Sequence, residues 1–247
     1  MAEPKIAKVV GKKRWTEILH SIYIKADFVT FEPGQFGRIG LKVDDKIIMR
    51  PYSFVNSPTE LRHEFYYAVV PEGPLSSRLS TLNSGDDIYI ADKPNGYLVL
   101  SEVPDAKQLW MLCTGTAVGP FLSILKNPKV WQRFEQLVLV HAVRHTADLS
   151  YGDEIQNLVE SSNGRLRFVP FVSRESYLDA LSGRIPTALE SGILQSRTGL
   201  DISPTDTQFM ICGNPQMVKD TSTTLQQMGF ERNRRRNPGH ITVENYW

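Results

Sequence analysis

Four consecutive residues, Arg50-Pro51-Tyr52-Ser53, place a fixed positive charge, an aromatic ring and a hydroxyl group in one short segment. An arginine neutralises phosphate, a tyrosine stacks on an aromatic ring, and a serine hydroxyl can hydrogen-bond to a ring nitrogen. Side chains alternate along a strand, so we expect Arg50 and Tyr52 on one face and Ser53 on the other. The segment suits a nucleotide with a flat ring, although an ordinary strand end on the surface fits the same residues.

A second segment with possible chemistry is Leu109–Phe121, which reads LWMLCTGTAVGPF. The pattern predicts an apolar strand, a tight glycine turn and the start of a helix. Glycines in such a turn let backbone N–H groups approach a phosphate or a flat ring closely. The G-x-x-x-G spacing lacks the full dinucleotide fingerprint, so a plain strand-to-helix connection fits this segment equally well.

An arginine or a glycine turn suited to an anion recurs where later strands are predicted to end. Val143-Arg144, Ser173-Arg174 and Gly213-Asn214 each follow a predicted strand, and Arg184 comes after a second glycine turn. In a parallel sheet, ligands bind at the carboxyl ends of the strands. Guanidinium groups bind phosphate in bidentate geometry, so Arg144, Arg174 and Arg184 together predict a site for a 2′-phosphate and a pyrophosphate. For any single arginine, a solvated surface charge remains the alternative.

The elements that must position these residues change in character along the chain. Residues from about Ile6 to Leu100 predict short strands, among them Glu64–Val70 and Tyr97–Leu100, with one helix over Leu75–Leu82. Short strands between Gly, Pro and Asp turns are typical of a small antiparallel barrel or sandwich.

After Val103-Pro104 the pattern favours a parallel α/β sheet, because continuous apolar strands alternate with helical segments. The predicted strands are Leu109–Leu112, Leu137–His141, Leu166–Val172 and Phe209–Cys212, and the predicted helices are Phe121–Leu125, Tyr151–Glu160 and Met217–Met228. We therefore expect a two-domain protein, with an antiparallel β-barrel in residues 1–101 and a parallel α/β sheet in residues 102–247.

Composition excludes several classes of protein. The 28 Lys and Arg nearly balance the 27 Asp and Glu, so the overall charge gives no signal for nucleic-acid binding. Cys113 and Cys212 form no C-x-x-C pair, and the histidines show no metal spacing, so we expect no metal site. No apolar run approaches the about 18 residues of a membrane helix, and the first residues lack the apolar core of a signal peptide. We expect a cytoplasmic location.

Six motifs, in order along nearly the whole chain, resemble those of the ferredoxin–NADP reductase superfamily, and in particular its compact bacterial members. Arg50-Pro51-Tyr52-Ser53 resembles the R-x-Y-S flavin motif, and Gly73-Pro74-Leu75-Ser76 resembles the second flavin segment. The other four resemble the G-T-G-x-x-P turn, the S-R-E of NADP-specific members, the C-G-x-x segment beside the nicotinamide and the aromatic C-terminus. In this sequence they are Thr114–Pro120, Ser173–Glu175, Cys212–Pro215 and Val243–Trp247.

The resemblance implies a flavoenzyme with an FAD barrel followed by an NADP domain. It implies that FAD is held by Arg50, Pro51, Tyr52, Ser53, Tyr67, Ala68, Val69, Pro74, Leu75, Ser76, Thr116, Tyr246 and Trp247. It implies that NADP(H) is held by Val143, Arg144, Ser173, Arg174, Arg184, Gly213 and Asn214. Ser53, Cys212 and Glu244 are then the expected catalytic residues, close to the path of the hydride.

The C-terminus departs from the plant pattern, in which the tyrosine is the last residue; here Trp247 follows Tyr246. Resemblance to bacterial members that end in this way implies that Trp247 lies on the adenine of a folded FAD. Whether Tyr246 covers the flavin, as a plant terminal tyrosine does, stays open.

The run Arg232, Arg234, Arg235 and Arg236 predicts a docking surface for an acidic electron carrier, ferredoxin or flavodoxin, on a monomer. The expected function is electron transfer between NADP(H) and such a carrier through FAD. Three alternatives stay open: a reductase of the same fold that acts on free flavin or a haem protein, a non-catalytic FAD electron-transfer module, and an interaction protein on a retained scaffold.

Overall fold

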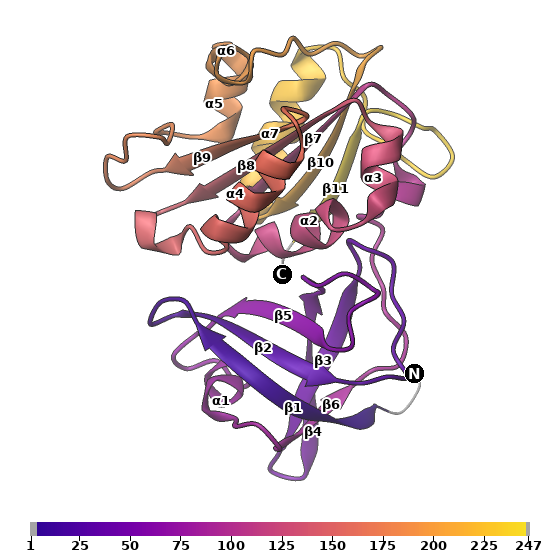
Figure 1. The fold of residues 1–247 in the computed structure, drawn as a ribbon, viewed down its shortest axis with the longest axis vertical. Coiled ribbons are helices and arrows are strands. Elements are labelled where there is room, and N and C mark those ends of the chain that lie inside the picture. Colours follow the sequence, from indigo (N-terminus) through magenta and orange to yellow (C-terminus); the bar gives the residue numbers. More distant parts are fainter. Residues whose placement is uncertain (1–3, 246–247) are drawn as a thin grey trace. The chain divides into compact units, whose positions relative to one another are not determined.

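The computed structural model describes residues 4–245, and the chain divides into two compact units (Figure 1). The first unit holds the residues up to Val99 together with Gly119–Lys126. The second holds Leu100–Val118 and the residues from Asn127 onward.

The first unit is built on a six-stranded antiparallel sheet with the strand order β4-β3-β6-β1-β2-β5. Alternate residues of these strands are apolar and pack with helix α1 into one core, which includes Ile22, Ile39 and Leu79. The elements are β1 (Lys5–Arg14), β2 (Leu19–Lys25), β3 (Phe36–Val43), β4 (Lys46–Ser53), β5 (His63–Ala68), α1 (Ser76–Thr81) and β6 (Asp87–Ile90). The predicted antiparallel sheet and the predicted helix are both confirmed.

The predicted barrel does not close among the described residues. Its edge strands, β4 and β5, share no ladder, and they are joined by the isolated bridge between Phe54 and Phe65 and by the Val55 N–H, which donates to the Glu64 carbonyl at 3.0 Å. Because these contacts involve only the residues just after β4, the sheet curls toward a barrel but stays open.

The strand predicted at Tyr97–Leu100 is wrong. Leu98 and Val99 are buried without joining a strand, and Leu100 begins the 3-10 turn η1 (Leu100–Glu102). The Leu98 carbonyl lies so close to Gly34 that a Cβ on Gly34 would be 1.9 Å from its oxygen. The apolar run is therefore buried against a glycine turn. Hydrophobic periodicity alone cannot distinguish this kind of burial from pairing with a neighbouring strand.

The second unit is built on a five-stranded parallel sheet with the strand order β11-β10-β7-β8-β9. Its strands are β7 (Gln108–Thr114), β8 (Gln136–Val143), β9 (Leu166–Val172), β10 (Thr207–Gly213) and β11 (Ile241–Asn245). The remaining elements are η2 (Gly115–Ala117), α2 (Val118–Leu125, most of which belongs to the first unit), α3 (Pro128–Arg133), η3 (Thr146–Asp148), α4 (Gly152–Ser161), α5 (Ile185–Glu190), α6 (Ile193–Thr198) and α7 (Pro215–Gln227). All four predicted strands are confirmed, and β11 is a fifth strand that the sequence pattern did not predict.

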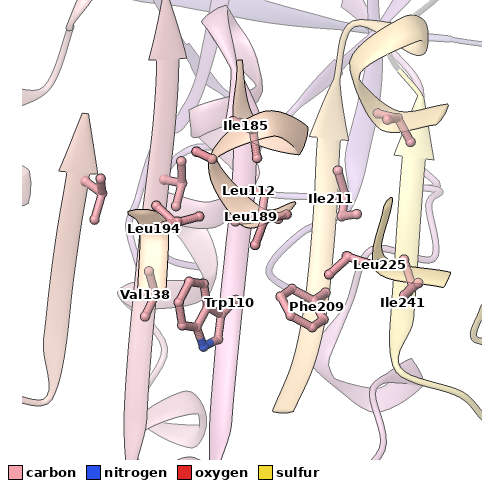
Figure 2. Close-up of a cluster of buried hydrophobic side chains, with 14 of the residues drawn as sticks. Trp110, Leu112, Val138, Ile185, Leu189, Leu194, Phe209, Ile211, Leu225 and Ile241 are labelled. Atoms are coloured by element: carbon pink, nitrogen blue, oxygen red, sulfur yellow. The ribbon is translucent and has the colours of Figure 1, made fainter. Parts of the chain in front are cut away.

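One face of this sheet is covered by α5, α6 and α7. Figure 2 shows Trp110, Phe209 and Ile211 from the strands packed with Leu189, Leu194 and Leu225 from these helices. Side chains alternate along a strand, so Cys113, His141 and Cys212 point to the opposite face. No helix in residues 4–245 is long and apolar enough to cross a membrane.

Candidate cofactor and nucleotide sites

The Arg50–Ser53 segment forms the end of β4 and keeps the alternation that the sequence predicts. It pairs with β3 in continuous register, Arg50 opposite Ile39 and Ser53 opposite Phe36. Arg50 is exposed, Tyr52 is half-buried and Ser53 is buried. The segment therefore presents a charge and a ring on one side and a hydroxyl on the other.

Tyr52 lies against Tyr67 of β5, with ring centroids 5.8 Å apart in an edge-to-face arrangement. Tyr67 is 2% exposed, and its hydroxyl has no hydrogen-bond partner among the described residues. Burial raises the pKa of Tyr52 to about 12 against the opposing effect of Arg50, and burial together with Tyr52 raises the pKa of Tyr67 above its ordinary value. The Tyr67 phenol thus remains a buried donor in need of an acceptor, which fits a flat ligand that carries oxygen or nitrogen acceptors.

The segment that leads into α1 uses its own serine hydroxyls to hold a turn. The Ser76 hydroxyl accepts from the Val70 N–H at 3.0 Å, and the Ser77 hydroxyl donates to the Gly73 carbonyl at 2.7 Å. Leu75 and Ser76 are buried, whereas Pro74 is exposed. Ala68 is exposed and Val69 half-buried just before this turn. The Ser76 hydroxyl uses only an acceptor lone pair in its bond, so its own O–H, together with backbone N–H groups, remains to donate to an anion here.

The glycine turn after β7 is fixed by a histidine from the neighbouring strand. The Gly115 carbonyl accepts from His141 Nε2 at 2.9 Å and from the N–H of Val118. His141 is fully buried, and burial lowers its pKa to about 4 against the opposing hydrogen bond. The imidazole is therefore neutral, with its proton on Nε2. In a trans peptide the N–H opposes the carbonyl, so this bond turns the Thr116 N–H away from His141.

The ends of β7 and β10 are locked together. The Thr114 hydroxyl accepts from the Asn214 N–H at 2.9 Å. Gly213 has φ +137°, and a Cβ there would lie 2.2 Å from the Thr114 hydroxyl oxygen. The Asn214 side chain accepts from the N–H groups of Gln216 and Met217 and so caps α7.

Cys212 stands in register between Cys113 and Glu244 on the adjacent strands. Burial raises the pKa of the Cys212 thiol well above its ordinary value, and the neighbouring Glu244 carboxylate adds to this effect. Cys212 is therefore a neutral, apolar wall rather than a thiolate nucleophile.

The ends of β8 and β9 bring the predicted arginines together. The Ser173 N–H donates to the Val143 carbonyl at 3.1 Å, and the Arg174 N–H donates to the Arg144 carbonyl at 3.0 Å. Phe171 and Leu181 form a parallel bridge. Arg174 lies three residues after Phe171, and Arg184 lies three residues after Leu181, so the two arginines leave this bridge in the same direction. Arg144, Arg174 and Arg184 are all exposed. The main-chain contacts thus bring the segments that carry these three arginines to one edge of the sheet.

The arginine loop, Arg232–Arg236, is an ordered turn. Arg234 and Asn237 exchange backbone hydrogen bonds of 3.0 and 2.9 Å, and all four arginines are exposed. The Asn233 side chain donates to the Glu102 carbonyl and to the Thr242 hydroxyl, and it accepts from the Gly239 N–H. Asn233 therefore anchors a surface of fixed positive charge.

Comparison with known proteins shows the family of this chain. A family model for the oxidoreductase NAD-binding domain matches residues 111–223. Flavodoxin/ferredoxin–NADP reductases from Shigella flexneri and Escherichia coli K12 are 46% and 45% identical over 248 residues, covering 100% of this chain and of each relative. The crystal structure of a ferredoxin NADP+ reductase from Neisseria gonorrhoeae with bound FAD and NADP superimposes with a TM-score of 0.95, at 35% identity and with 100% of both chains covered.

The chain belongs to the flavodoxin/ferredoxin–NADP reductase family.

For a member of the flavodoxin/ferredoxin–NADP reductase family, the motif residues fall on the expected elements. The R-x-Y-S motif ends β4, the glycine turn follows β7, and the S-R-E segment follows β9. The C-G-x-x segment begins with Cys212 and Gly213, the last two residues of β10. Tyr246 and Trp247 lie outside the described residues. No group of three His, Cys, Asp or Glu in the described range could hold a metal ion.

Four residues that have no assigned role from the sequence hold the loops around these segments in place. They are Thr114, His141, Glu175 and Asn233, whose contacts come from other strands or loops. One signal was available for His141, because a histidine inside the apolar run LVLVH must find a hydrogen-bond partner when it is buried.

Proposed function

We propose that this protein transfers electrons between NADP(H) and a one-electron carrier, ferredoxin or flavodoxin, with FAD bound chiefly by residues 1–101 and NADP(H) by residues 102–247. The observation that carries the proposal is the gathering of Arg144, Arg174 and Arg184 at the carboxyl edge of the parallel sheet. FAD supplies the exchange between the two electrons of a hydride and single electrons. The whole-length similarity to named reductases supports the same function.

On the flavin side, residues of β4, β5 and α1 are proposed to make different kinds of contact with FAD. Arg50 offers charge to a pyrophosphate, Tyr52 offers an aromatic face, and the buried Tyr67 hydroxyl offers a donor. Ser53 is the proposed catalytic hydroxyl on this side. The remaining proposed contacts are Pro51, Ala68, Val69, Pro74, Leu75, Ser76 and Thr116, with Tyr246 and Trp247 from the C-terminus.

On the nucleotide side, the guanidinium groups bind phosphate and the neighbouring main chain sets their spacing. Arg174 and Arg184 are proposed to bind the 2′-phosphate, and Arg144 with Ser173 to complete the anion site next to Val143. Gly213 and Asn214 are proposed to border the nicotinamide, with Cys212 and Glu244 as catalytic neighbours. The protonated Cys212 thiol would exclude water without competing as a nucleophile.

The first test is an absorption spectrum of the purified protein, followed by addition of NADPH without oxygen. Flavin bands that bleach rapidly with NADPH, and far more slowly with NADH, are the expected result. A colourless protein would contradict the FAD site. Flavin bands that persist after NADPH is added would contradict the nucleotide site.

We further propose that the arginine loop docks the acidic carrier, and that the protein works as a cytoplasmic monomer. Charge complementarity speeds encounter and makes it sensitive to salt. Arg235→Glu should lower carrier reduction about fivefold to tenfold at low salt and leave NADPH oxidation by ferricyanide unchanged. Lys219→Glu, a change at an exposed cation on α7, is the matched control. Equal effects of the two variants would remove the loop from the docking surface, and a dimer in light scattering would contradict the monomer.

A further inference from the structure

Glu175 presents a puzzle, because a carboxylate at an anion site should repel the phosphate that Arg174 beside it is proposed to bind. The structure turns this carboxylate toward the neighbouring loop. Its Oε1 accepts from the Thr146 N–H, and its Oε2 lies 3.7 Å from His145 Nδ1. The Glu175 side chain therefore bridges from the segment after β9 to the segment after β8.

The receiving loop starts immediately after Arg144 and is itself closed. The Asp148 N–H donates to the His145 carbonyl at 3.0 Å, and the His145 N–H donates to the Asp148 carboxylate at 3.3 Å. Hydrogen bonds from the side chain and then the backbone N–H of Thr146 lower the pKa of Glu175 below its ordinary value. Glu175 is therefore ionised at neutral pH, and it binds the turn at residues 145–148, which its own hydrogen bonds already hold closed.

The bridge extends the connection between the two arginine-bearing segments. Main-chain hydrogen bonds join Ser173 to Val143 and Arg174 to Arg144. One residue after Arg174, the connection continues through a side chain, because the Glu175 carboxylate accepts a hydrogen bond from the Thr146 N–H. Arg144 and Arg174 are thus held from both sides, by the sheet before them and by the Glu175 bridge after them.

We infer that Glu175 is a positioning residue for NADP(H): it holds Arg174, which is proposed to bind the 2′-phosphate, at a fixed spacing from Arg144 in the same anion site. The inference rests on the proposed function and adds a residue that determines cofactor preference. The bridge also occupies the carboxylate, since an acidic group near the ribose would otherwise accept from the 2′-hydroxyl of NADH. Glu175 thereby favours NADPH while carrying the same charge as its phosphate.

Two variants separate positioning from simple charge. Removal of the carboxylate by Glu175→Ala should raise the KM for NADPH about tenfold, leave kcat within twofold and leave the KM for NADH unchanged. Glu175→Gln should recover most of the NADPH affinity, because its amide oxygen still accepts from the Thr146 N–H. If only charge mattered, both variants would bind NADPH more tightly than the parent protein, and that result would overturn the inference.

The experiment uses the FAD-loaded protein, and Arg174→Ala serves as the reference variant. Loss of NADPH preference in Arg174→Ala with no change in Glu175→Ala would overturn the inference alone. No change in either variant would overturn the proposed NADP(H) site and the inference with it. Equal losses with NADPH and NADH in Glu175→Ala, together with a lowered melting temperature, would show a general structural role and would also overturn it.

Discussion

In the parallel sheet, the ends of β7 and β10, here called the inner ends, and the ends of β8 and β9, here called the outer ends, are held by different means. At the inner ends, β7 and β10 are locked by Thr114, Gly213 and His141, through neutral groups and close packing. At the outer ends, β8 and β9 are joined beyond their ladder by the exposed, charged Glu175, next to exposed arginines.

This difference suits two tasks: the inner ends keep a fixed geometry, and the outer ends recognise a charged group. A hydrogen bond between neutral groups is little affected by salt, whereas exposed charges are screened over about 8 Å at physiological ionic strength. The inner ends border the proposed nicotinamide region, where small displacements slow a reaction strongly. The outer ends meet the proposed phosphate, where charge decides which cofactor is preferred.

The largest expected effect comes from adding one methyl group at the inner ends. Gly213→Ala places a Cβ 2.2 Å from the Thr114 hydroxyl oxygen at a residue with φ +137°. Strain and overpacking together should lower the free energy of unfolding by about 3 kcal/mol, measured by urea denaturation. Gly164→Ala is the matched control, because Gly164 has φ +79° and open space around it, and it should lose about 1 kcal/mol. Equal losses would mean that the contact with Thr114 is easily relieved.

The next effect concerns the pH dependence of the same inner ends. Burial lowers the pKa of His141 from its ordinary 6.5 to about 4, so protonation favours the unfolded chain. The stability that neutral His141 contributes is complete above pH 6.5 and is lost as the pH falls toward 4. At pH 5 the loss should be about 2 kcal/mol, at about 1.4 kcal/mol for each pH unit.

Urea denaturation of His141→Leu at pH 7 and pH 5 measures this contribution. The variant should lose much less stability over this interval than the parent protein. Burial also lowers the pKa of His63, so His63→Phe is the control. This variant should still show the loss of stability between pH 7 and pH 5 that His141 causes. Parallel losses in His141→Leu and the parent protein would place the titrating group elsewhere.

The sequence predicts the fold well where local patterns coincide with burial. The four central strands of the parallel sheet are continuous apolar runs, and all four are confirmed. Ile241–Asn245 was missed as a strand because it carries Thr242, Glu244 and Asn245 and forms at the sheet edge by pairing with β10. Tyr97–Leu100 was wrongly predicted as a strand, because an apolar run signals burial and not the partner that buries it.

For the candidate sites, the sequence predicts which residue types could bind and leaves out what orients them. Arg144, Arg174 and Arg184 could be grouped because parallel strands end at one edge. The contact between Glu175 and Thr146 spans 29 positions, and that between Asn214 and Thr114 spans 100. Such partners are set by the packing of strands, which no local pattern encodes.

The third prediction tests the outer ends through cofactor choice. Arg174→Ala combined with Arg184→Ala should remove two charge-assisted contacts to the 2′-phosphate and leave those to the rest of the nucleotide. The ratio of kcat/KM for NADPH to that for NADH should fall about thirtyfold, a loss of about 2 kcal/mol of discrimination. Steady-state rates with both cofactors measure it. An unaltered ratio would mean that other groups bind the 2′-phosphate.

The smallest expected effect is a difference in salt dependence between the outer ends, which are proposed to bind phosphate, and the inner ends. Raising the ionic strength from about 0.02 M to 0.5 M shortens the screening length to a few ångströms, so the exposed guanidinium groups lose part of their attraction for phosphate. The KM for NADPH should rise several-fold and that for NADH less, while hydride transfer at saturating NADPH stays constant, because neutral groups hold the inner ends. In the Arg174→Ala/Arg184→Ala protein the salt dependence should be nearly the same for both cofactors. A rate at saturation that falls with salt in the parent protein would show that the inner ends also depend on exposed charge.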